Sequence, residues 1–159
     1  MANPSAFNAS HTGREYVMSE IEEIVETFEF LDDWDARYQY LIELGEALPP
    51  MPAELKCDEN WVKPCMSTVH VAALSMDGDP ARVRFVGDCD TAIIKGVLAL
   101  LIDLLSNRSP QEIRQLDVDG LFKRLQLEEH LSPNRHVGIY AIVDKMIERA
   151  SALAHQRVN

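Results

Sequence analysis

Apolar residues along the first third of the chain recur at helical spacing. Ser19 and Glu22 have the spacing of an N-terminal capping box, and an apolar stripe at i, i+3, i+4 and i+7 accompanies it. The stripe consists of Ile21, Ile24, Val25 and Phe28. Asp32 or Asp33 can cap a second helix, which is expected to end before Pro49 because proline restricts its predecessor and lacks a donor. The expected buried face of that helix is Trp34, Tyr38, Leu41, Ile42 and Leu48.

The pattern then changes to an irregular stretch and to strand-like alternation. Prolines and polar residues fill residues 49–66, which predicts a largely irregular segment. β-Forming residues over 68–74 and 81–86, joined by turn residues at 76–80, predict an antiparallel hairpin.

Helical signals fill the remainder of the chain. Residues 91–106 are apolar nearly all round, which predicts a central buried helix, and Asp90 is expected to cap it. A serine–proline start signal at Ser109 predicts a short helix, another is expected around 118–125, and the same signal at Ser132 starts a long amphipathic helix. The order of elements indicates an α+β fold, with helices packed on one face of a small antiparallel sheet.

Length and composition indicate a single packed domain. The chain has 159 residues, of which 47% are hydrophobic. The first residues have no secretory-signal pattern and are interpreted as a disordered tail over 1–18. One domain is therefore expected over 19–154, followed by a short C-terminal tail over 155–159.

Charge narrows the classes of partner. With 15 Lys and Arg against 26 Asp and Glu, the formal net charge is −11. This balance argues against binding to nucleic acid or to anionic membranes, which needs clustered basic residues. The longest uncharged apolar piece, 96–102, is far shorter than the about 20 residues of a membrane span. A cytoplasmic location is the expectation.

Cysteine is the residue type that offers chemistry. The sequence has no phosphate-binding glycine loop, no serine-hydrolase elbow and no paired histidines of a zinc protease. Cys65 precedes the first predicted strand in the irregular segment, where a thiol can reach another protein. A buried small hydrophobe is the commoner role of a lone cysteine, so the pattern alone leaves both interpretations of Cys65 open.

The other two cysteines are less promising. Two flanking aspartates are expected to raise the pKa of Cys89, which is interpreted as structural. Cys57 follows a lysine and precedes two acidic residues, and it is expected to be a surface thiol. Together with His70 the three cysteines could form a zinc site, although no closely spaced cysteine pair supports it.

Six short motifs stand in order along the chain. They are D-W-D-x-R-Y-x-Y-L-I-E-L-G at 33–45, L-P-x-M-P at 48–52, V-x-x-C-x-S-x-V at 62–69, G-D-x-D at 87–90 with I-K-G at 94–96, S-P-x-E-I at 109–113 and H-L-S-P-x-R-x-x-G at 130–138. In this order and register, residues 21–150 resemble the SufE/CsdE family of sulfur-acceptor proteins.

The resemblance implies a fold like that of IscU-type scaffolds and an accessory sulfur-transfer role rather than an independent enzyme. A SufE-like protein takes persulfide sulfur from a SufS/CsdA-type cysteine desulfurase, stimulates that enzyme and passes the sulfur to an iron–sulfur cluster scaffold. Cys65 matches the acceptor. Arg135, in the Ser-Pro-x-Arg pattern, is expected to orient the loop, to contact the desulfurase or to pair with an acid such as Asp90. No cofactor is implied for this chain, since pyridoxal phosphate belongs to the desulfurase.

Two positions depart from the family pattern. Pro64 stands where the family usually has glycine and is expected to stiffen the loop, and His70 stands where it usually has tryptophan. Residues 57–68 are expected to supply mobility, and Val69 and Val71 a shelter for the persulfide. An adaptor that acts without the thiol is one alternative. The other is an IscU-like metal or cluster scaffold that binds through Cys57, Cys65 and Cys89.

Overall fold

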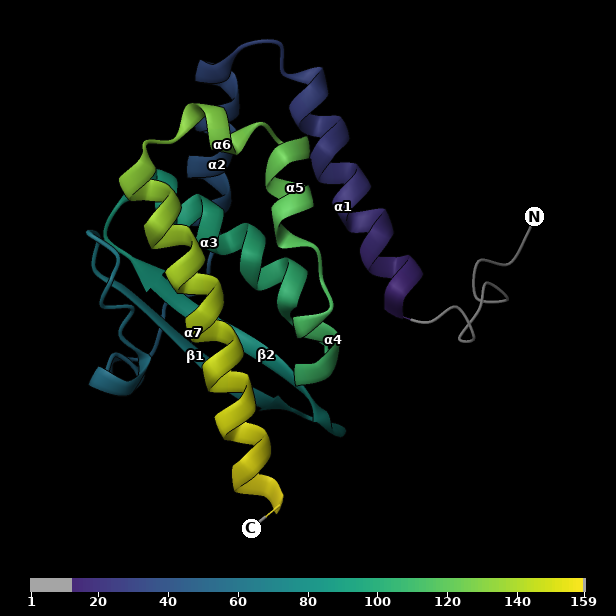
Figure 1. Cartoon of the computed structure of the whole chain (residues 1–159), viewed down its shortest axis with the longest axis vertical. Coiled ribbons are helices and arrows are strands. Elements are labelled where there is room, and N and C mark those ends of the chain that lie inside the picture. Colours follow the sequence, from purple (N-terminus) through teal and green to yellow (C-terminus); the bar gives the residue numbers. More distant parts are fainter. Residues whose placement is uncertain (1–12, 159) are drawn as a thin grey trace, which may run out of the picture.

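The computed structural model describes the backbone of residues 13–158 and the side chains of residues 22–156. Helices surround a central helix and pack on one face of a hairpin (Figure 1). The elements are α1 (Gly13–Phe30), α2 (Trp34–Glu46), the 3-10 turns η2 (Ala53–Leu55) and η3 (Asp58–Asn60), β1 (Val69–Met76), β2 (Asp79–Cys89), α3 (Ala92–Leu105), α4 (Pro110–Arg114), α5 (Val118–Arg124), α6 (Leu127–His130) and α7 (Pro133–Val158). The predicted α+β fold class is confirmed.

The first and last helices are longer than predicted. α1 begins at Gly13, so Ser19 lies inside a helix and the predicted start there is wrong. Residues 14–18 contain no helix breaker, and the capping-box spacing does not by itself stop a helix from extending further toward its N-terminus. Part of the predicted tail over 1–18 is therefore helical, and its first 12 residues lie outside the described residues. α7 likewise continues to Val158, into the predicted tail over 155–159.

The strands form an antiparallel hairpin that turns at Asp77 and Gly78, as predicted. Val69 lies opposite Cys89 and Val71 opposite Gly87. This face is covered by helices, because a Cβ at Gly87 would lie 3.1 Å from Leu98 Cδ2 of α3. Both α3 and α7 pack on the hairpin.

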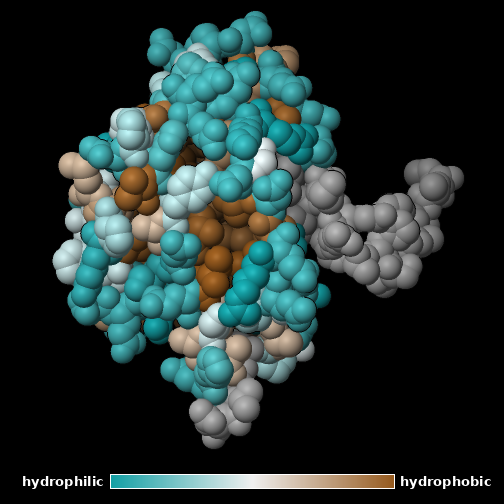
Figure 2. Space-filling model, in the orientation of Figure 1, coloured by the Kyte–Doolittle hydropathy of each residue, from teal (hydrophilic) through white to brown (hydrophobic). Residues whose placement is uncertain are grey.

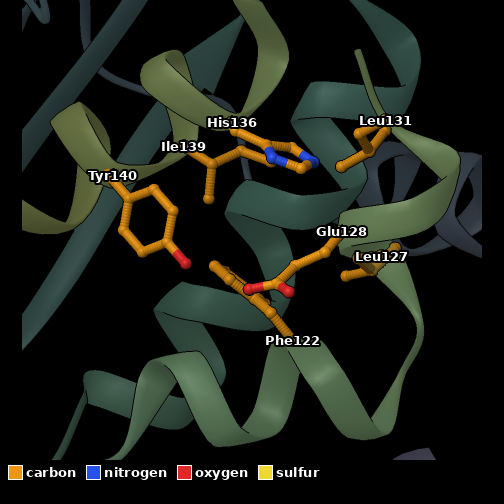
Figure 3. Close-up of a pocket in the computed structure, with 7 residues that line it drawn as sticks. All are labelled: Phe122, Leu127, Glu128, Leu131, His136, Ile139 and Tyr140. Carbon is orange, nitrogen blue, oxygen red and sulfur yellow. The ribbon is translucent and has the colours of Figure 1, made fainter. Parts of the chain in front are cut away.

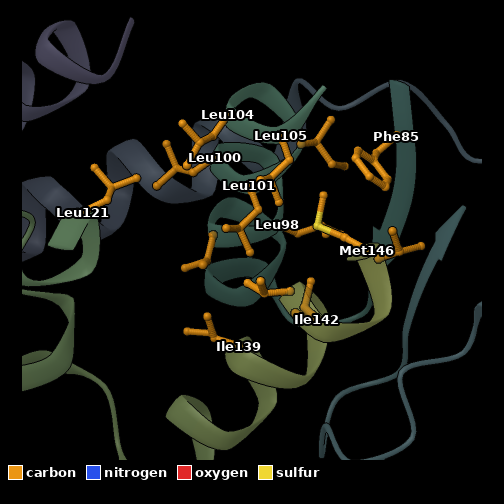
Figure 4. Close-up of a cluster of buried hydrophobic side chains, with 14 of the residues drawn as sticks. Phe85, Leu98, Leu100, Leu101, Leu104, Leu105, Leu121, Ile139, Ile142 and Met146 are labelled. Atoms are coloured by element: carbon orange, nitrogen blue, oxygen red, sulfur yellow. The ribbon is translucent and has the colours of Figure 1, made fainter. Parts of the chain in front are cut away.

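The core is built around α3. Ten of its 14 residues are buried, which confirms the predicted central helix. Ile139, Ile142 and Met146 of α7 and Phe85 of β2 pack with its leucines (Figure 4). Seen from the side of α7, apolar side chains gather in the hollow between α7 and the α4–α5 region, where α3 runs (Figure 2). No helix in the described part of the chain has the length and hydropathy to cross a membrane.

The first motif holds the ends of α1, α2 and α6 together. The Asp33 carboxylate caps α2 by accepting from Ala36 N–H at 2.8 Å, as predicted. Arg37 Nε donates to the carbonyl of Phe28 at 2.8 Å, at the end of α1. Trp34 stacks on His130 with ring centroids 3.7 Å apart. The residues of this motif therefore have a structural role in joining helices.

Two glycines let α2 and α3 cross at close range. A Cβ at Gly96 would lie 2.1 Å from the carbonyl oxygen of Leu41, and one at Gly45 would lie 2.9 Å from Gly96 N. Both clashes are with backbone, which side-chain rotation cannot relieve. The crossing therefore requires glycine at both positions.

Replacing Gly96 with alanine is expected to lower the free energy of unfolding by about 3 kcal/mol, because the two helix backbones must separate. Urea unfolding measures the difference. Ala92→Ser, at the exposed start of α3, is the control and should change stability by less than about 0.5 kcal/mol. Equal stability of Gly96→Ala and the unchanged protein would contradict the close crossing.

Candidate functional site

Cys65 lies in a tight turn between η3 and β1. Its N–H donates to the carbonyl of Val62 at 3.3 Å, and Pro64 lies within this turn. Val62 is fully buried, and its N–H donates to Val69 O at 2.9 Å. Cys65 is partly exposed, and the neighbouring Met66 is 81% exposed. The turn thus presents sulfur at the surface of a fixed framework.

The segment before the turn is attached to the body at several points. Lys56 Nζ pairs with Asp88 at 2.9 Å, and Glu59 pairs with Arg149 of α7 at 3.6 Å. The buried Asn60 side chain donates to the carbonyl of Leu55 at 2.8 Å. Within the segment predicted to be mobile, Glu59 and Val62 thus have contacts outside it, whereas the Asn60 hydrogen bond is local.

A pocket of about 430 Å³ opens beside the Cys65 sulfur. Its lining residues come from the loop, the end of the hairpin, the start of α3 and the start of α7: Cys65, Met66, Ser67, Asp90, Thr91, Ile94, Ser132, Asn134 and Arg135. The lining is mainly polar, with Ile94 as the apolar contribution of α3. Val69 and Val71, expected as a shelter, instead face the core.

A chain of hydrogen bonds joins the walls of this pocket. Arg135 Nη1 donates to Ser67 Oγ at 3.0 Å, and Ser67 Oγ lies 2.6 Å from Thr91 Oγ1. Thr91 Oγ1 in turn donates to Asp90 Oδ1 at 3.3 Å. Ser67 is 94% buried at the centre of the chain, since its exposed fraction is 6%. Of the predicted roles for Arg135, the structure shows contact with the loop, and among the described side chains it forms no ion pair with Asp90.

The prediction that Asp90 caps α3 is wrong. Thr91 is the N-cap residue, without a side-chain hydrogen bond to the helix. Asp90 Oδ1 instead accepts the N–H of Thr68 at 3.0 Å, which closes the open end of the hairpin. Asp88 pairs with Lys56 and Lys95, and their hydrogen bonds outweigh the opposing effect of burial and lower its pKa.

Cys89 and Cys57 have different surroundings from Cys65. Cys89 is buried, which is the main cause that raises its pKa to about 11; the flanking aspartates contribute less. Cys57 is exposed, as predicted. Within residues 22–156, no three His, Cys, Asp or Glu side chains are grouped so that they could hold a metal ion. Cys57, Cys65 and Cys89 therefore do not form such a group.

Helix α7 approaches the Cys65 sulfur at Gly138. A Cβ at this position would lie 2.8 Å from Cys65 Sγ and 3.5 Å from Cys65 Cβ. Gly138 and Ser67 belong to two of the six motifs, although the motifs alone indicate no role for either residue. The signal for Gly138 was available, because a glycine inside a helical pattern usually has a packing reason.

A second, smaller cavity lies between α5, α6 and α7 (Figure 3). Phe122, Leu127, Leu131 and Ile139 supply its apolar lining, while His136 and Tyr140 extend from α7 beside it. Its volume of about 10 Å³ is at the lower limit for a single water molecule. The cavity is too small for a substrate and is separate from Cys65.

Comparison with known proteins identifies relatives over most of the chain. The family model of SufE, described as the Fe-S metabolism associated domain, matches residues 22–150. An uncharacterized SufE-like protein of Rhizobium etli is 36% identical over 144 residues, which cover 89% of this chain and 97% of that protein. A second, of Rhizobium meliloti, is 34% identical over 134 residues, or 84% and 96% of the two chains.

A solved structure shares the fold. The solution structure of a hypothetical protein from Thermus thermophilus matches with a TM-score of 0.67 at 23% identity. The match covers 85% of this chain and 96% of that one. At this identity the likeness supports the α+β fold alone.

Alkylation with iodoacetamide at pH 8 is expected to modify Cys57 and Cys65 well before Cys89. With a pKa of about 11, Cys89 holds only about one thousandth of its population as thiolate at pH 8. Because deprotonation rises with pH, its labelling should increase toward pH 11. Peptide mass spectrometry at several pH values measures this, and early labelling of Cys89 at pH 8 would contradict it.

Replacing Ser67 with alanine is expected to lower the free energy of unfolding by about 1–2 kcal/mol, since Arg135 and Thr91 lose their shared partner. Hydrogen exchange should speed up in residues 63–68. Lys63→Ala, with its exposed ion pair, is the control and should cost less than about 1 kcal/mol. Unchanged exchange in Ser67→Ala would show that the hydrogen-bond chain does not hold the loop.

Proposed function

The chain belongs to the SufE family, and we propose that it accepts sulfur from the persulfide of a SufS/CsdA-type cysteine desulfurase onto Cys65. In this proposal it also stimulates the desulfurase and delivers the sulfur to an iron–sulfur cluster scaffold in the cytoplasm. The observation that carries the proposal is the placement of the Cys65 thiol, which is partly exposed in a tight turn and lines an open pocket.

The transfer is a thiol–disulfide type of exchange. The Cys65 thiolate attacks the outer sulfur of the partner's persulfide, and a new S–S bond forms on Cys65. The S–S bond within the partner breaks, and the partner's cysteine leaves as a thiolate. The proton lost by Cys65 balances the one that the partner's cysteine regains, and there is no net oxidation or reduction. Pyridoxal phosphate serves the earlier step, in the partner, that generates the persulfide.

The surroundings of Cys65 suit this step. An attacking thiol needs an open line of approach to a sulfur atom on another protein, and the pocket provides space beside Cys65. Cys89 is a poor candidate for the same role, because it is buried and its pKa is about 11. Arg135 both holds the loop through Ser67 and lines the pocket, so that a segment of the partner that enters the pocket meets its guanidinium.

Intact-mass spectrometry after incubation with a cysteine desulfurase, pyridoxal phosphate and cysteine, without reductant, tests the proposal. The protein is expected to gain about 32 Da, one sulfur atom, and to lose it when a thiol is added. Cys65→Ser should show no gain because the acceptor is missing, whereas Cys57→Ser should gain as the unchanged protein does.

Three outcomes contradict parts of the proposal. An unchanged mass with several active desulfurases would exclude the carrier function. A gain in Cys65→Ser would assign the acceptor to another cysteine. Stimulation of the desulfurase by Cys65→Ser at the level of the unchanged protein would indicate an adaptor that acts without the thiol.

A further inference from the structure

The position of the Cys65 sulfur is defined by α7 as well as by its own loop. Gly138 is buried one turn after the start of α7, and the position that its Cβ would take lies 2.8 Å from Cys65 Sγ. Real Cβ atoms do not approach other atoms this closely, so the sulfur occupies space that any other residue at 138 would fill. The pocket with Ser67, Thr91 and Ile94 is open to the same side chain.

Helix stability does not explain this glycine. Within a helix, glycine is less favourable than alanine because it loses more backbone entropy on folding. The backbone φ of Gly138 is not positive, unlike that of Gly78, so backbone conformation does not require glycine at 138. The contact with Cys65 is therefore the feature that distinguishes position 138 from its helical neighbours.

We propose that Gly138 is the positioning residue for the Cys65 sulfur. The missing side chain leaves a seat, formed by the α7 backbone at 138, in which Sγ rests when the loop is in its present conformation. An outer sulfur, bonded about 2.05 Å from Sγ, has no room on the α7 side and extends into the pocket. The statement on the outer sulfur rests on the proposed function; the seat itself does not.

The distances indicate what an alanine at 138 would do. Only Sγ lies closer than ordinary contact, while Cys65 Cβ and Cα are 3.5 and 3.6 Å from the added atom. Rotation about the Cα–Cβ bond of Cys65 moves the sulfur to another staggered position and relieves the clash. Gly138→Ala therefore displaces the sulfur while the loop backbone keeps its place.

The rate of Cys65 alkylation in the free protein tests the seat without any desulfurase. In a Cys57→Ser background, Gly138→Ala is expected to react with iodoacetamide several-fold faster, because the sulfur has left the α7 wall. Val137→Ala, at the exposed neighbouring position, is the matched control and should keep the original rate. An unchanged rate in Gly138→Ala, or an equal increase in Val137→Ala, would overturn the proposal.

A double-mutant comparison of melting temperatures tests whether the sulfur is the atom involved. In a Cys65→Ala background no sulfur opposes the new methyl group, so Gly138→Ala should raise the midpoint by about 2–4 °C through helix preference alone. With Cys65 present the gain should be smaller or reversed. The same gain in both backgrounds would overturn the proposal.

With the desulfurase, the loaded Gly138→Ala protein should lose its persulfide sulfur to an added thiol faster than the unchanged protein. If both proteins lose the persulfide sulfur at the same rate, the statement on the outer sulfur is wrong. The position of Sγ at Gly138 is then decided by the alkylation and melting measurements. A failure of the unchanged protein to take up sulfur would contradict the proposed function alone, because alkylation and melting do not depend on it.

Discussion

The apolar surface of α3 is the constraint on which the rest of this structure depends. Ten of the 14 residues of this helix are buried and only Ala92 and Asp103 are exposed, so other elements must cover most of its surface. The hairpin covers one side and α7 another, and α2 comes close enough only because Gly45 and Gly96 carry no side chains. Two elements that border the site, β2 and α7, are thus positioned by contact with α3, and β1 is positioned by contact with both of them.

The site follows from where the hairpin opens. Pairing of Val69 with Cys89 places the residues before β1 beside those after β2, and this brings Ser67 to Thr91. Packing of α7 on the hairpin and α3 then brings Arg135 to Ser67. Three segments far apart in sequence therefore meet at Cys65: the loop before β1, the residues after β2 and the start of α7. Each is attached to an element that packs in the core. Because these segments are held in place, any movement of the Cys65 sulfur is expected to come from the turn that carries it.

Local patterns predicted the elements well where a cap or a proline marks a boundary. Asp33 and Ser109 cap their helices as expected, and α2 ends before Pro49. α6 was missed because it has only four residues and follows Gln126, an N-cap residue with positive φ that no periodicity indicates. The motifs located Cys65 and Arg135, whereas the roles of Ser67 and Gly138 come from contacts across about 70 residues of chain. Short-range spacing carries no information on such contacts.

The two departures from the SufE pattern, Pro64 and His70, lie on either side of Cys65, the first in its turn and the second in β1. Trp61 forms an isolated antiparallel bridge with His70, and residues paired in this way project to the same side of the sheet. The Trp61 indole and the His70 side chain therefore lie on the same side. Lys63 lies over the Trp61 ring, with Nζ 5.6 Å from the ring centroid.

Pro64 lies in the turn closed by the hydrogen bond from Cys65 N–H to Val62 O. This turn needs no N–H donor from residue 64, so proline fits there. With proline at 64 and histidine at 70, the chain keeps the pocket beside Cys65 and the hydrogen bond from Arg135 to Ser67, so neither departure disrupts the walls of the site.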